Sequence, residues 1–156
     1  MTRLGLASAA MLGLASLMTP ARVAAQDAGV TGAAEAAFPT GAAFNGIPLK
    51  GLTLGQGLFI TQDGSAGGQF QVVLQGTSPL GTPQNVTVEG EVAGGSVGAD
   101  GSATFSGSAT VDMGDGTLPL AGVPFTVTAS AGSLGLILNA VALPTATLTA
   151  GSIAVK

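Results

Sequence analysis

Apolar and polar residues alternate along most of the chain, most clearly between Ser102 and Ala129. In the first half of this stretch, one set of alternate positions is small or apolar: Ala103, Phe105, Gly107, Ala109, Val111 and Met113. The positions between them carry Ser, Thr or Asp. Successive side chains of a β-strand point to opposite faces, so this pattern predicts a half-buried strand. Gly114-Asp115-Gly116 supplies a turn that tolerates positive φ, and we therefore expect a long β-hairpin.

The turn also predicts which residues of this hairpin face each other. If Asp115-Gly116 is a two-residue turn, Val111 lies opposite Leu120 and Met113 lies opposite Leu118. Both arms then begin with apolar side chains on the same face.

Farther along the second arm, the apolar residues between 123 and 129 have the opposite parity. A one-residue slip would expose all of them, so we predict a β-bulge near Ala121-Gly122 that restores them to the buried face. With this bulge, Phe105 lies across from Val127, and Phe125 lies across from Gly107 and covers it.

Similar alternation predicts further strands over 47–54, 56–61, 69–75, 85–92, 134–139 and 146–155, separated by Gly, Pro and Asp turns. No sustained helical period appears. The predicted fold is therefore all-β: an antiparallel β-sandwich of about eight short strands, with a closed or partly open β-barrel as the alternative.

The N-terminus predicts an exported protein. A charged start, an apolar run from Leu4 to Met18 and small residues before Ala25 are typical of a signal peptide, so we expect residues 1–25 to be cleaved. Fifteen apolar residues are short for a bilayer that needs roughly 20, and we do not expect an integral membrane protein after processing. Residues 26–45 show no sustained period and are interpreted as a flexible leader, with a short helix near 32–37 as an option. Residues 46–156 then form one domain.

Charge and cysteine content indicate where the protein is located and which partners it is expected to bind. Cleavage leaves Lys50 and Lys156 against eight Asp and Glu residues, a formal charge of −6. Nucleic acid is not an expected partner of such an acidic chain, because phosphate binding draws on clustered Lys and Arg. The absence of Cys in an exported chain resembles bacterial rather than small animal secreted domains, where disulfides are common. We therefore expect a secreted or periplasmic location.

The residue types exclude most catalytic chemistry. The chain has no His, Cys, Tyr or Trp, so a Ser/His/Asp or Cys/His arrangement and a zinc site of His or Cys ligands are impossible. We assign no catalytic residues and no cofactor. Glu89 and Glu91 would project from one strand face roughly 6–7 Å apart, near the carboxylate spacing of glycoside hydrolases, although two solvated glutamates are the simpler interpretation.

Aspartates beside glycine turns are the remaining candidates for a site. Asp112 and Asp115 are the candidate calcium ligands, but their spacing matches no calcium-binding loop and Asp-Gly is a preferred hairpin turn in its own right. We therefore assign no metal.

We interpret the chain as an exported, non-catalytic structural or binding module of the surface, matrix or adhesion type. Its polar, low-charge strand faces suit a protein or carbohydrate partner at the cell surface. The first alternative is a carrier of a small apolar ligand or lipid, because Gly90 and Gly107 are predicted to face inward and a large internal cavity could form. A carboxylate-dependent hydrolase built on Glu89 and Glu91 is the second alternative.

Overall fold

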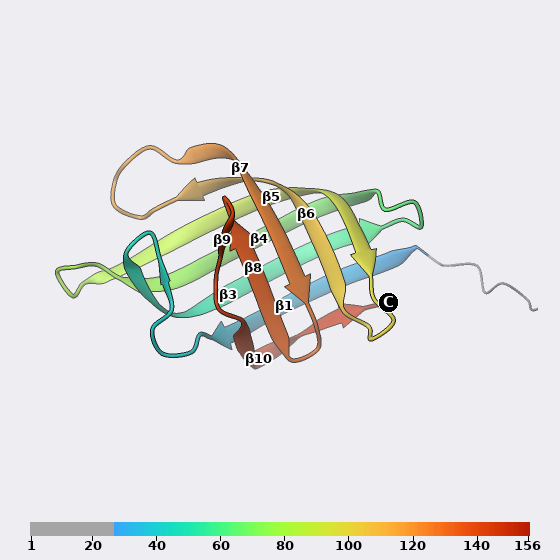
Figure 1. Cartoon of the computed structure of the whole chain (residues 1–156), viewed down its shortest axis with the longest axis horizontal. Coiled ribbons are helices and arrows are strands. Elements are labelled where there is room, and N and C mark those ends of the chain that lie inside the picture. The colour runs from blue at the N-terminus through green and yellow to red at the C-terminus, as the bar shows by residue number, and fades with distance from the viewer. Residues whose placement is uncertain (1–26) are drawn as a thin grey trace, which may run out of the picture.

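A computed structural model describes residues 27–156, and every regular element in that range is a β-strand (Figure 1). Eight of the strands are long, and β2 and β9 have two residues each. The elements are β1 (Ala28–Ala37), β2 (Ala43–Phe44), β3 (Ile47–Ile60), β4 (Ala66–Thr77), β5 (Pro83–Val97), β6 (Ala103–Asp112), β7 (Leu120–Ala129), β8 (Ser133–Leu138), β9 (Val141–Ala142) and β10 (Ala146–Val155). The predicted all-β fold is confirmed.

The long strands pair in antiparallel fashion and form a ring. The hydrogen-bonded order is β1-β10-β8-β7-β6-β5-β4-β3, and β1 also pairs with β3, so the series returns to its start. The β8–β10 junction is short, with Ala146 opposite Leu134 and Thr147 opposite Ser133. The ring has two layers, since β7 and β8 cross in front of β3 and β4 (Figure 1). The sheet therefore combines the layered packing of a sandwich with the continuous pairing of a barrel.

Residues 28–37 are a strand, not part of a flexible leader or a short helix. β1 pairs along its length with β3, and it buries Val30, Ala34 and Ala36. Its inward side chains are mostly alanine, which gives little hydropathy contrast against the outward Thr31 and Ala33 but suits close packing. The ordered domain therefore begins before residue 46. The predicted signal peptide, residues 1–25, lies outside the described residues.

β3 is one 14-residue strand, although the sequence predicted two strands over 47–54 and 56–61. The predicted break lies beside Gln56, a polar residue that holds the inward position between Leu54 and Leu58.

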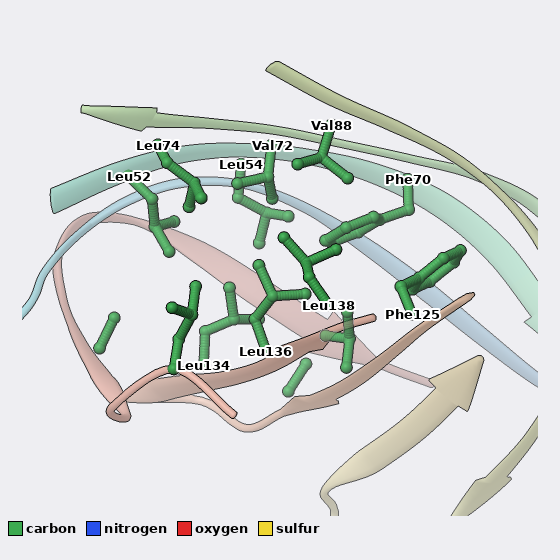
Figure 2. Packing of buried hydrophobic residues seen from close by; sticks show 14 of the residues in the cluster. Leu52, Leu54, Phe70, Val72, Leu74, Val88, Phe125, Leu134, Leu136 and Leu138 are labelled. Atoms are coloured by element: carbon green, nitrogen blue, oxygen red, sulfur yellow. The ribbon is translucent and has the colours of Figure 1, made fainter. Parts of the chain in front are cut away.

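The core fills the space between the two layers (Figure 2). Side chains from β3, β4 and β5, including Leu52, Leu54 and Val72, lie on one side, and those of β7 and β8, including Leu136 and Leu138, lie on the other. Three aromatic rings pack together at one end of this row: Phe70 stacks on Phe125 with centroids 5.3 Å apart, and Phe105 meets both rings edge-on. Such ring pairs add specificity to the burial of apolar area.

The predicted register of the β6–β7 hairpin is confirmed beyond its turn. Val111 pairs with Leu120, the register shifts across Ala121-Gly122, and Gly122 adopts a φ of 70°. A bulged residue with positive φ is the conformation that glycine adopts without strain. The shift then places Phe125 opposite Gly107, and Phe105 opposite Val127, as the apolar parity required.

The turn of this hairpin is longer than predicted. β6 ends at Asp112 and β7 begins at Leu120, so residues 113–119 form a loop instead of a two-residue turn, and Met113 does not pair with Leu118. Leu118 is 90% exposed. Pro119 has no N–H to donate to a ladder, which is one reason that the pairing stops before this point.

Phe125 does not cover Gly107, although the two residues lie opposite each other. The ring of Phe125 lies over Gly90 of β5, where an added Cβ would be 2.6 Å from Cε1 of the ring. The Cβ position of Gly107 is instead occupied by the backbone of β5 at Glu91, next to the register shift between Val92 and Gly94. Each glycine therefore permits a close approach, but by different neighbours.

Candidate functional site

A hollow with a volume of about 440 Å³ lies on the outer face of the sheet, across β4, β5 and β6. We call it the polar hollow and define it by its six outward side chains: Gln69, Gln71, Glu89, Glu91, Ser108 and Thr110. All six are exposed. Gly122, at the β7 bulge, lines it as well.

Strand register arranges these six side chains in two rows. Gln69, Glu91 and Ser108 lie opposite one another on neighbouring strands and form the first row. Gln71, Glu89 and Thr110 form the second row in the same way. Opposed side chains on one face of a sheet lie close enough to interact, so each row is a continuous line of hydrogen-bonding groups.

The predicted pair Glu89 and Glu91 lies within the polar hollow. Nε2 of Gln71 donates a hydrogen bond to Oε1 of Glu89 at 3.2 Å. No Lys or Arg lines the hollow. Both carboxylates are therefore open to solvent and to a ligand, and one of them is oriented by a neighbouring amide.

Sequence reasoning identified the two glutamates but not their four companions. The period of two over residues 69–75 correctly marked Gln69 and Gln71 as outward. It carried no information on which strand would lie beside which, and only the β4-β5-β6 order brings the amides and hydroxyls next to the glutamates. Consecutive antiparallel strands are commonly neighbours, and that tendency was the one available signal.

The turn aspartates are each engaged within their own turns. Asp115 Oδ1 accepts hydrogen bonds from the hydroxyl and the backbone N–H of Thr117, and Asp100 Oδ1 accepts the same pair from Ser102. These bonds hold the pKa of both carboxyls below the ordinary 3.8, and the bond from the hydroxyl has the largest effect.

The pKa of Asp63 is lowered in the same way, because its carboxylate accepts hydrogen bonds from the Thr61 hydroxyl and the Ser65 N–H.

The candidate calcium ligands do not converge. Asp112 Oδ1 accepts a hydrogen bond from the N–H of Gly114, while Asp115 Oδ1 accepts one from the N–H of Thr117. Within residues 27–156, no three Asp or Glu side chains come together as a metal ion would require.

Two further hollows are small for a carried molecule. One of about 40 Å³ lies at one end of the ring, where Phe44 and Val111 meet the exposed Leu120 and Val141, and one of about 200 Å³ lies beside Ile60 and Val97. Pockets that enclose a drug-sized ligand measure roughly 300–1,000 Å³. The inward positions of Gly90 and Gly107 do not add a cavity, because an aromatic ring and a neighbouring backbone occupy them.

No known protein family, characterised protein or solved structure matches this chain. Between residues 27 and 156, the structure has no helix of the length and apolar character needed to cross a bilayer.

Proposed function

We propose that the protein is an exported, non-catalytic binding module and that the polar hollow is its binding surface. The observation that carries this proposal is the two-row arrangement of six exposed polar side chains in one hollow of about 440 Å³. Two amides, two carboxylates and two hydroxyls offer both donors and acceptors, so a polar partner can replace its water contacts with protein contacts.

The same geometry argues against a hydrolase. Glycosidases place one carboxyl in apolar surroundings to make it a general acid, whereas Glu89 and Glu91 are both exposed on one strand face. Glu89 and Glu91 are alternate residues of β5 and project from the same face of one strand. They are therefore not arranged on opposite sides of a scissile bond. If the protein hydrolysed chromogenic glycosides and Glu89→Gln removed that activity, the hydrolase would replace the binding module.

A carrier role receives less support from the same structure. The buried side chains form one continuous core cluster, and the hollows of about 40 and 200 Å³ are smaller than pockets that enclose a drug-sized ligand. Native mass measurement of protein purified from its own host tests this directly, because it reports signal cleavage and any bound molecule together.

The binding proposal is tested with arrays of immobilised glycans and peptides. Labelled wild-type protein should bind members of at least one array. Ser108→Arg, which fills the polar hollow, should abolish the signal, while Thr128→Arg, a change of another exposed hydroxyl residue on β7, should keep it. Absence of binding on both arrays, or equal binding by the two variants, would reject the proposal.

A further inference from the structure

The surface beside the polar hollow on β3 is bare backbone. Gly57 pairs with Gln69 and Gly55 pairs with Gln71, so two glycines extend the two rows by one strand. We call them the glycine strip. No heavy atom lies within 4 Å of the position that a Cβ would take at either glycine. The outward face is therefore open and flat next to the two glutamine amides.

An exposed aromatic ring lies at one end of the glycine strip. Phe59 is the next outward residue of β3 after Gly57, and it is 55% exposed. Its ring lies over Gly67 of β4, where an added Cβ would be 2.8 Å from the ring Cζ. Its neighbour on the other side is also a glycine, Gly29 of β1. Because Gly67 has no side chain, the ring can lie down along the sheet and not stand away from it.

Together these features form a continuous polar surface with an apolar platform at its edge. From β3 to β6, three steps between neighbouring strands span about 14 Å. Along the strand direction, alternate residues are about 7 Å apart, which is the separation of Phe59 from Gly57. The surface is thus longer than a single small polar molecule needs, and it suits an extended ligand.

We propose, on the basis of the binding role assigned above to the polar hollow, that its ligand is a neutral oligosaccharide. One sugar unit packs on the ring of Phe59 and the following units cross the glycine strip to the amides of Gln69 and Gln71. A sugar ring combines an apolar C–H face, which packs on an aromatic ring, with hydroxyls that both donate and accept hydrogen bonds. The carboxylates of Glu89 and Glu91 accept from such hydroxyls at the far side.

Other polar ligands fit the surface less well. An anionic glycan or nucleic acid would meet the two carboxylates without any cation lining the hollow. A basic peptide would satisfy the carboxylates, but it would leave the exposed Phe59 and the flat glycine strip without a role. A neutral polyol uses all three parts.

The experiment is a titration of the mature chain followed by NMR, with cellohexaose, xylohexaose, maltohexaose and a β-1,4 oligomer of N-acetylglucosamine as probes. We expect at least one probe to shift the Phe59 ring signals together with the side-chain amide signals of Gln69 and Gln71. Loss of ring packing in Phe59→Ala should weaken this binding about two- to tenfold, because an aromatic contact contributes about 0.5–1.5 kcal/mol and 1.4 kcal/mol is a factor of ten. Ile137→Ala, a change of another exposed apolar residue on β8, should leave the affinity unchanged.

The outcomes separate this inference from the function on which it rests. If the oligosaccharides bind and Ser108→Arg abolishes binding, but Phe59→Ala does not weaken it, the platform is wrong and the binding module stands. If only basic peptides of the peptide array bind, and Ser108→Arg abolishes that binding, the ligand class is wrong and the module stands. If no probe of either kind depends on the polar hollow, both proposals fail. Thermal melts of each variant show whether a lost signal reflects a lost fold.

Discussion

Gln56 is a polar side chain in the apolar interior, and its replacement should stabilise the protein. It lies on the inward face of β3 between Leu54 and Leu58, with a relative exposure of 9%. Neither Oε1 nor Nε2 has a hydrogen-bond partner among the described residues. Its cross-strand neighbours are Gly32 and Phe70, neither of which offers a side-chain donor or acceptor.

The magnitude follows from the two unpaired atoms. Each buried polar group without a partner costs about 1–3 kcal/mol, while a leucine of similar volume removes that cost and joins the leucines on either side. We expect Gln56→Leu to raise the free energy of unfolding by about 2 kcal/mol after allowance for imperfect packing. For a domain of this size, this corresponds to an increase in Tm of about 7 °C.

The assay is urea unfolding of both proteins, followed by circular dichroism, with a two-state analysis and an unchanged m-value as the check. Gln69→Leu is the matched control, since Gln69 is exposed on the neighbouring strand and its replacement should change stability by less than about 0.5 kcal/mol. If Gln56→Leu destabilised the protein while Gln69→Leu did not, the interior amide would have a partner, such as an enclosed water, and the reasoning would be refuted.

Three further predictions concern glycines and turns. Gly90→Ala should destabilise the fold by about 1–3 kcal/mol, because the new Cβ meets the Phe125 ring, and a second change, Phe125→Leu, should recover part of the loss in a double-mutant cycle. Gly122→Ala should lower the free energy of unfolding by about 1 kcal/mol because of the positive φ at the bulge, whereas Gly132→Ala, which has neither positive φ nor close neighbours, should be nearly neutral. On acidification, the stabilising turn bonds should persist through the ordinary aspartate value of 3.8 and disappear only as pH falls through the lowered pKa values. NMR titration of the carboxyl carbons should therefore give midpoints below 3.8 for Asp63, Asp100 and Asp115; any midpoint above it contradicts the turn geometry.

The sequence was most informative where apolar parity left one register possible. The change of parity across Ala121-Gly122 required a bulge there, and the structure has it, because any other pairing would expose Phe125 and Val127. The alternation of apolar residues does not determine side-chain rotamers or the contacts between strands that are two positions apart in the sheet. The ring of Phe125 therefore covers Gly90, on a strand that does not adjoin its own.

Weak hydropathy contrast between inward and outward positions explains the strands that the sequence did not predict correctly. β1 buries alanines, whose small transfer free energy hardly distinguishes them from the exposed residues between them, so the strand resembled a leader. The buried Gln56 interrupts the apolar pattern of β3, so the sequence predicted two strands where there is one. These two errors cancelled in the count of about eight strands. The polar hollow is formed by side chains from three neighbouring strands, so its prediction requires the order of the strands in the sheet. The alternation along a single strand identified only its two glutamates.

The pairing of β1 with β10 sets the order of events when the protein folds. Every other long-strand junction except β1–β3 and β8–β10 joins consecutive strands, whereas Val30 pairs with Val155 from the opposite end of the chain. Contacts at such separation form late, because the chain entropy of closing the whole loop must be overcome first. During synthesis, β1 is made first and β10 last. The ring therefore cannot close until β10 is available, and one side of β1 has no partner strand until then.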